Sequence, residues 1–403
     1  LYFKKNKRAH CILFAGMGVM IFSFGTRNSF GLFLEPVSTF YEWERTIFAT
    51  AIAVQNLIWG LSQPFFGGLA DRYGENKILS IGAFLYFVGI LGMALCTTEQ
   101  GLYLTLGLLC GIGLSGASIT IVIAAVTKVA PTNRRSFFLG LITAAGSLGQ
   151  FIVVPATQFL ISTEGWKVAA VILAIMVLLI PAFSLGFKNG TQKEISRPTK
   201  SEITTAYNTA LRHKSYLLLL LGFFVCGFHV AFITNHLPAY IHDLGINREL
   251  GALAISIIGL FNVVGASASG YLGGIFSKKN LLSLLYLLRA LVMSYFLLAP
   301  TTEFNLIVFS GLIGLLWLST VPLTSGLVSV MFGQRYMGSL YGLVFLAHQL
   351  GAFFGVLLGG IIFSIFNSYD YMWICAIGLS VLASAIHLPI EENSVPMTKS
   401  LAN

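Results

Sequence analysis

Long apolar runs alternate with short polar segments along almost the whole chain. Each of twelve runs spans about 18 residues or more, the length that a helix needs to cross the hydrocarbon core of a bilayer. One long polar segment separates the first six runs from the last six. The pattern predicts an all-α membrane protein with twelve transmembrane helices, at residues 10–36, 46–69, 78–97, 101–127, 136–162, 166–187, 216–241, 250–272, 281–299, 304–331, 337–365 and 370–389.

The composition agrees with this interpretation. Apolar residues make up 56% of the 403 residues and charged residues only 10%, and the mean hydropathy is +0.83. A soluble protein of this length could not bury so much apolar surface. A large soluble α/β protein is therefore excluded.

An internal repeat relates the two halves. At an offset of about 202 residues, Gly25 aligns with Gly227 and Pro36 with Pro238. A repeat at half the chain length is typical of transporters that arose from a duplicated six-helix unit. We expect two pseudo-symmetric six-helix bundles at 1–187 and 215–403, joined by a cytoplasmic linker at 188–214 that holds one short amphipathic helix near 202–212.

The distribution of basic residues predicts the orientation in the membrane. The two termini, the linker and the loops on the same side carry 19 of the 24 Lys and Arg, whereas the opposite loops carry only Arg45, Lys167 and Arg248. The positive-inside rule then predicts that both termini lie in the cytoplasm. The membrane is expected to be the inner membrane of the cell. The net charge of +9 reflects this topology, so the expected partner is a lipid bilayer and not a nucleic acid.

A polar segment between the second and third runs has a specific pattern. It reads Gly67-Gly68-Leu69-Ala70-Asp71-Arg72-Tyr73-Gly74-Glu75-Asn76-Lys77, which predicts a tight turn between two helices. The segment resembles the signature loop of the major facilitator superfamily of secondary transporters. That resemblance implies a role in conformational gating for Gly67, Asp71, Arg72 and Gly74. A second copy at 270–282 has Gly274 where Asp71 stands.

Charged residues within the spans are rare and indicate the substrate class. Arg27 and Arg289 lie inside apolar runs, whereas none of the 15 acids lies deep within one; Glu35, at the outer end of the first run, comes nearest. Transporters of cationic drugs usually require an embedded carboxylate, whereas an embedded arginine favours a carboxylate or another oxyanion. We therefore expect a cationic cavity and a small anionic substrate.

Arg27 is the strongest candidate for the substrate site. It lies about 25 Å along the first helix, beside Asn28, and His229 occupies the equivalent position in the second half. The repeat predicts that Arg27 and His229 face each other across the interface between the halves. The alternative is that Arg27 extends toward the membrane surface or donates to helix carbonyls. Other candidate ligands are Asn235, Asn262, His348, Gln349 and Arg289.

The histidines and Arg289 allow more than one interpretation. His229 and His348 are candidates for proton coupling, because imidazole changes its charge near neutral pH, but a histidine in an apolar helix is often a core residue. Arg289 either binds the substrate or donates to backbone carbonyls or a phosphate headgroup. The amides could equally join neighbouring helices by hydrogen bonds.

Two further motifs point to a subgroup. His236-Leu237-Pro238-Ala239-Tyr240 and the run from Ile258 to Gly265 resemble bacterial relatives of the monocarboxylate porter group. The resemblance implies transport of small organic acids with a proton or by exchange. The Asp and Arg that animal members carry in helix 8 are Asn262 and Ala266 here, and the usual arginine of helix 4 is Gly107. A lactate–proton mechanism therefore cannot be transferred unchanged.

Together these features predict a secondary transporter that moves a small or medium organic anion by alternating access, as a monomer and with protons as a candidate coupling ion. The alternative within transport is an exporter of an amphiphilic metabolite, siderophore or drug. A membrane receptor or scaffold is disfavoured, because it needs neither matching halves nor a signature loop. No metal cluster, cofactor motif or nucleophile pattern supports an enzyme.

Overall fold

The protein is described from a computed structural model, in which residues 2–131, 135–187, 199–300, 302–333 and 336–395 are placed. The first half of this part consists of helices α1 (Tyr2–Asn28), η1 (Phe30–Phe33), α2 (Leu34–Tyr41), α3 (Arg45–Tyr73), α4 (Glu75–Leu95), α5 (Glu99–Leu102), η2 (Tyr103–Leu109), α6 (Cys110–Gly116), α7 (Ile119–Val129), α8 (Arg135–Glu164), α9 (Trp166–Val177), α10 (Ile180–Ser184) and η4 (Leu185–Phe187). The second half consists of α11 (Lys200–Leu211), α12 (Lys214–Asp243), α13 (Arg248–Leu272), α14 (Lys278–Leu298), α15 (Glu303–Leu316), α16 (Thr320–Phe332), α17 (Met337–Phe366) and α18 (Asp370–His387).

The helices have the length and composition of membrane spans. Eleven stretches of the described chain are long and apolar enough to cross a bilayer, and α3, with 29 residues, completes the predicted twelve. Large apolar side chains face outward on many of them, for example Phe84 and Leu291, which are 58% and 59% exposed. Such a surface is stable in lipid but not in water. The chain is therefore a multi-pass membrane protein with an all-α fold, as predicted.

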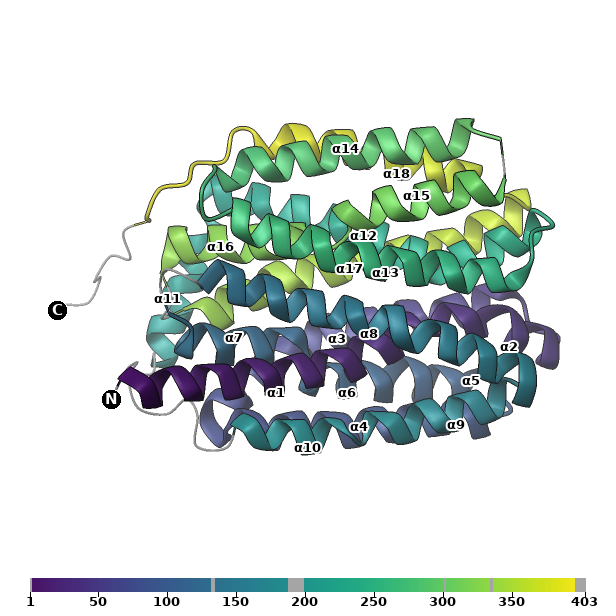
Figure 1. Ribbon diagram of the computed structural model, residues 1–403, viewed down its shortest axis with the longest axis horizontal. Helices are drawn as coiled ribbons and strands as arrows, with labels where there is room; N and C mark the ends of the chain where they lie inside the picture. The colour runs from purple at the N-terminus through teal and green to yellow at the C-terminus, as the bar shows by residue number, and fades with distance from the viewer. Residues whose placement is uncertain (1, 132–134, 188–198, 301, 334–335, 396–403) are drawn as a thin grey trace.

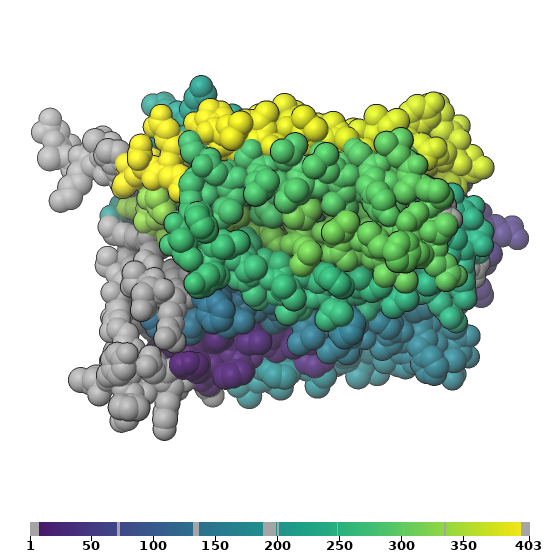
Figure 2. Space-filling view, turned by 45° about the horizontal axis from the view of Figure 1, so that its top comes forward, coloured from purple at the N-terminus to yellow at the C-terminus, as the bar shows by residue number. Residues whose placement is uncertain are grey.

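The two halves form adjacent bundles. Helices α1 to α10 lie in the lower layer of Figure 1 and α12 to α18 in the upper layer, and the surface in Figure 2 shows the same division. The bundles meet along two helix pairs, α3 with α17 and α8 with α13. The repeat offset relates one pair to the other. Helix α1 begins and α18 ends at the same end of the molecule (Figure 1). We call this end the terminus end and the opposite one the far end.

The bundles are joined tightly at the far end. Arg45 at the start of α3 forms two hydrogen bonds with Asp243 at the end of α12, at 2.6 and 2.8 Å, and Thr46 bonds Ser364 of α17 at 2.8 Å. Gly31 in η1 packs on the backbone of α12, where a Cβ atom would overlap the carbonyl oxygen of Thr234. These contacts close the far end above Arg27, and beside them a surface hollow of about 450 Å³ is lined by residues of both bundles.

The contact between α3 and α17 is looser toward the terminus end. A Cβ atom added at Gly67 or Gly68 in α3, or at Gly342 in α17, would meet no atom within 4 Å. Between these glycines and the far end, the two helices touch where Gly60 packs on Gln349. The interface is therefore asymmetric along the membrane normal.

The signature segment is more helical than the sequence indicated. Helix α3 continues through Tyr73, four residues beyond the predicted span, and α4 starts at Glu75. Only Gly74 separates them, with a φ of 97° that favours glycine. Lys128 at the end of α7 bonds Glu75 at 3.2 Å, which ties this corner to a neighbouring helix. The side chains of Asp71 and Arg72 lie outside the described part of the structure, so their gating role stays a prediction.

The linker contains the short helix that was expected. Helix α11 starts with a capping box, in which Thr199 and Glu202 bond each other's backbone N–H groups. The prediction of a helix near 202–212 is confirmed, whereas residues 188–198 of the linker lie outside the described part.

Candidate substrate site

Arg27 lies at the point where the first transmembrane segment changes geometry. The α-helix ends at Asn28, and a 3₁₀ turn follows at Phe30–Phe33. The Arg27 side chain is 6% exposed. Its guanidinium donates to Asn56 Oδ1 of α3 at 2.9 Å and to Asn28 Oδ1 at 3.3 Å, and it lies 5.2 Å from the ring centre of Trp59.

The charge of Arg27 is not balanced by an acid. No ion pair of the described residues includes Arg27; those of Arg45 with Asp243, Lys128 with Glu75 and His242 with Glu35 lie elsewhere. Its Nε–H group is buried without a hydrogen-bond acceptor among the described residues. Burial of an unpaired cation is costly. A bound anion would remove that cost and would satisfy the unused donor.

A chain of polar side chains passes through Arg27 in the first bundle and contacts the second bundle at both of its ends. In α17, His348 Nδ1 bonds Gln349 Oε1 at 2.9 Å, and the Gln349 amide donates at 3.5 Å to the same Asn56 oxygen that accepts from Arg27. On the other side of Arg27, Asn28 donates to Gln150 of α8 at 2.8 Å. Gln150 in turn donates at 2.6 Å to the Ile255 carbonyl of α13. The chain of bonds therefore crosses both helix pairs of the interface.

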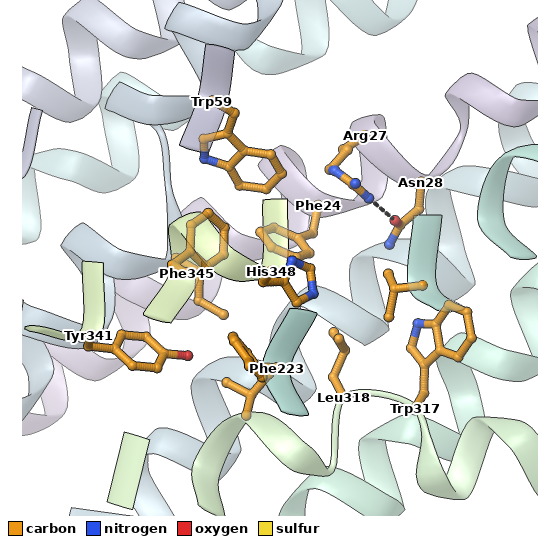
Figure 3. Close-up of a pocket in the computed structure, with 13 residues that line it drawn as sticks. Phe24, Arg27, Asn28, Trp59, Phe223, Trp317, Leu318, Tyr341, Phe345 and His348 are labelled. Atoms are coloured by element: carbon orange, nitrogen blue, oxygen red, sulfur yellow. Dashed lines mark hydrogen bonds between the residues drawn. The ribbon is translucent and has the colours of Figure 1, made fainter. Parts of the chain in front are cut away.

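A cavity lies between the bundles, and some of these hydrogen-bonded side chains line it together with aromatic rings. Arg27, Asn28 and His348 line it together with apolar side chains of both halves (Figure 3): Phe24, Trp59, Ile119, Phe223, Val230, Trp317, Leu318, Val321, Tyr341 and Phe345. Its free volume is about 30 Å³, which holds one or two water molecules but not an organic substrate. The bundles must separate before a substrate fits.

A central cavity between two matching six-helix bundles is typical of one transporter fold, and comparison with known proteins identifies it. The family model described as "Major Facilitator Superfamily" matches residues 15–356. The chain belongs to the major facilitator superfamily. It is a transporter and not an enzyme.

Individual relatives within the superfamily are distant. An uncharacterized transporter of this superfamily, YcxA from Bacillus subtilis, is 24% identical over 85% of this chain and 85% of its own. Monocarboxylate transporter 13 of Bos taurus is 25% identical over 90% and 84%. The oxalate:formate antiporter of Oxalobacter formigenes is 24% identical over 92% and 88%. The chain thus aligns with these transporters over most of their length.

His229 does not face Arg27, contrary to the expectation from the repeat. Its Nε2 donates to the Ala376 carbonyl of α18 at 2.9 Å, so the ring points into the second bundle of the transporter. His229 is also absent from the cavity wall. Asn235 donates to the Ala231 carbonyl one turn earlier, at 2.7 Å, beside the far-end contact with Gly31. Neither side chain reaches the cavity in this structure.

Arg289 and Asn262 support a break in the tenth transmembrane segment. Helices α15 and α16 are separated at residues 317–319, and the Arg289 guanidinium donates to the carbonyls of Leu316 and Trp317. Asn262 accepts from the Leu318 N–H at 2.9 Å and donates to Ser147 of α8 at 2.5 Å. Both side chains are almost fully buried and neither lines the cavity. They hold the broken segment that presents Trp317 and Leu318 to the cavity.

We expect Asn262→Leu to destabilise the transporter. The substitution keeps the volume of the side chain similar but leaves the Leu318 N–H and the Ser147 hydroxyl without Asn262, and an unsatisfied buried polar group costs about 1–3 kcal/mol. Thermal unfolding of the purified protein in detergent should show a lower melting temperature. Ser147→Ala, which removes only one of the two bonds, serves as the matched control and should lower it less. An unchanged melting temperature in Asn262→Leu would show that the break is held by other contacts.

Sequence reasoning did not find the aromatic wall. Trp59, Phe345 and Trp317 are apolar residues in spans that consist mostly of apolar residues, so hydropathy does not separate them from side chains that face lipid. A weak signal existed for Trp317, because it follows a glycine-rich helix and precedes Ser319-Thr320. Asn56 and Gln150, which extend the polar chain, were recognisable as polar residues within spans. Their partners were not.

Proposed function

We propose that this protein is a secondary active transporter for an organic anion of the monocarboxylate class, and that it works by alternating access. Arg27 binds the carboxylate, and the Asn28 amide donates a hydrogen bond to it. The observation that carries the proposal is the buried guanidinium of Arg27, which lines the interface cavity and has no carboxylate partner among the described residues. The names of the relatives, monocarboxylate transporter and oxalate:formate antiporter, support a small organic anion as the substrate.

The closed far end corresponds to one state of the transport cycle. The distribution of basic residues favours the terminus end as the cytoplasmic side, so the far end faces outward. The contacts of Arg45 and Thr46 across the interface then close the outer side. The opposite state requires these contacts to break and the loosely packed ends of α3 and α17 to meet.

The proposal predicts a pH dependence that involves His348. This side chain lines the cavity together with Arg27 and Tyr341, and its protonated form adds a second cation near the bound carboxylate. Because a protonated His348 would attract the carboxylate, we expect binding to strengthen as the pH is lowered from mildly alkaline to mildly acidic. His348→Gln should remove this dependence, whereas His229→Gln should keep it. Counterflow in proteoliposomes across this pH range checks the prediction, and a flat profile in the unmodified protein would exclude histidine from coupling.

An exporter of amphiphilic compounds is the second candidate function, and the aromatic wall favours it. A thermal-shift screen of the purified protein against organic acids, metallophores and cationic drugs separates the two functions, because a ligand of the folded state raises the melting temperature. Stabilisation by organic acids supports the proposed function. Stabilisation by cations alone would overturn it.

A further inference from the structure

The walls of the cavity carry more information about the substrate than its charge alone. Arg27 and Asn28 lie together at one side, and His348 lies between them and the rings of Phe345 and Phe223 (Figure 3). No acid of the described residues lines the cavity, and Arg27 is its one arginine or lysine. A second carboxylate on the substrate would therefore lie against aromatic rings and would have no arginine or lysine to bind.

Aromatic rings form a continuous path away from Arg27. The guanidinium lies 5.2 Å from the Trp59 ring centre, and Trp59 contacts Phe345 of α17 at 5.1 Å between ring centres. Phe345 stacks on the His348 ring at 5.6 Å and 9°, and His348 lies 4.9 Å from Phe223 of α12. The path begins in the first bundle and ends in the second.

Two further rings close the path on the side of the second bundle. Trp317 lies at the break between α15 and α16, and Tyr341 lies near the terminus end of α17; both line the cavity. Trp317 is held in place by the bonds that Arg289 and Asn262 make to the break. Aromatic side chains of both bundles therefore face any ligand whose carboxylate is bound at Arg27.

We infer that the substrate is a monocarboxylate that carries an aromatic or bulky branched apolar group. This inference rests on the proposed function, because it takes Arg27 as the carboxylate site. When the bundles separate, the carboxylate binds Arg27 and Asn28. The apolar group enters between Trp59 of the first bundle and the rings of Phe345, Phe223 and Trp317 of the second. Rings prefer offset-stacked or edge-to-face contacts with other rings, which such a cleft supplies.

The same geometry disfavours two other kinds of acid. Lactate or acetate buries almost no apolar surface against the rings, so its binding depends on Arg27 alone. Oxalate carries a second negative charge, and the aromatic wall offers no cation to bind it. Burial of an unpaired charge in a site of low polarity is costly. A phenyl ring buries enough apolar area to strengthen binding by about 30-fold over acetate.

A binding panel with the purified full-length protein in lipid nanodiscs tests the inference. The probes are phenylacetate and indole-3-acetate, with acetate, lactate and oxalate as small acids and phenylacetamide as the uncharged control. We expect the two aromatic acids to bind at least about tenfold more tightly than each small acid. Phenylacetamide should bind more weakly than phenylacetate, because it lacks the charge that Arg27 recognises.

Variants of the wall complete the test. Phe345→Leu and Trp317→Phe keep an apolar side chain and should weaken phenylacetate more than acetate, whereas Phe159→Leu, on a side chain that is 67% exposed, should change neither. If small acids bind with a dependence on Arg27 but aromatic acids bind no better, the inference fails and the proposed function stands. If phenylacetamide binds as tightly as phenylacetate and Arg27→Gln has no effect on any acid, the proposed function fails as well.

Discussion

Arg27→Gln is expected to weaken binding of the anionic substrate by roughly ten- to a hundredfold. Hydrogen bonds to a charged group contribute about 1.5–3 kcal/mol, and each 1.4 kcal/mol is a factor of ten in affinity. Glutamine keeps a donor near Asn56 and Asn28 but carries no charge. Titration of the purified protein with phenylacetate and acetate, followed by thermal shift or calorimetry, measures the change.

Two variants make this result specific. Arg27→Lys should recover only part of the affinity, because an ammonium group cannot reproduce the planar fork of the guanidinium. His229→Gln should leave affinity unchanged, since His229 bonds the Ala376 carbonyl and does not line the cavity. Equal affinity in Arg27→Gln and the unmodified protein would remove Arg27 from the site.

Gly31→Ala should slow transport by roughly ten- to a hundredfold while the substrate still binds. The added Cβ atom would overlap the backbone oxygen of Thr234 and lie 3.0 Å from the Asn235 Cα atom, so no side-chain rotation relieves the clash. Overpacking of this kind costs about 1–3 kcal/mol, and the cost applies only to the state that is closed at the far end. The population of that state, and with it the turnover rate, should fall.

Counterflow in proteoliposomes measures the rate, and labelling of Ser364→Cys by a membrane-impermeant maleimide measures the opening of the far end. Labelling should increase in Gly31→Ala. Gly378→Ala is the control, because a Cβ atom there meets no atom within 4 Å. Normal turnover in Gly31→Ala would show that η1 and α12 need not touch during the cycle.

The sequence predicted the fold well because a bilayer restricts what a chain can do. Spans of about 20 apolar residues are readable from hydropathy alone, and the repeat gave the division into matching bundles. Helix ends were harder to place. Helix α3 ends four residues beyond its predicted span. The prediction ended the helix where the polar segment begins, but residues 70–73 are helical as well.

In the candidate site, the sequence identified the charged residue but not the apolar residues around it. Arg27 was found because an arginine within an apolar run is rare and expensive. The repeat predicted that His229 faces Arg27, and this was wrong. Arg27 lines the cavity, whereas His229 donates to the Ala376 carbonyl of α18, so equivalent positions of the two halves do not share a direction.

The aromatic wall shows a different limit. Phe345 is 4% exposed and lines the cavity, and Phe159 is 67% exposed on the outer surface. Both lie in apolar helices, and lipid tails favour phenylalanine as much as a protein interior does. Only the packing of the bundles separates the two kinds of position.

The unpaired charge of Arg27 also makes the proposed transporter sensitive to voltage. Its empty form carries a positive charge between the bundles, and binding of a monoanion neutralises that charge. Reorientation of the empty form therefore moves charge through the membrane field, where a full crossing changes the energy by about 2.3 kcal/mol per 100 mV. Net transport, which requires the empty form to return, should produce a current. One-for-one exchange of monoanions, in which only the neutral form reorients, should be electrically silent.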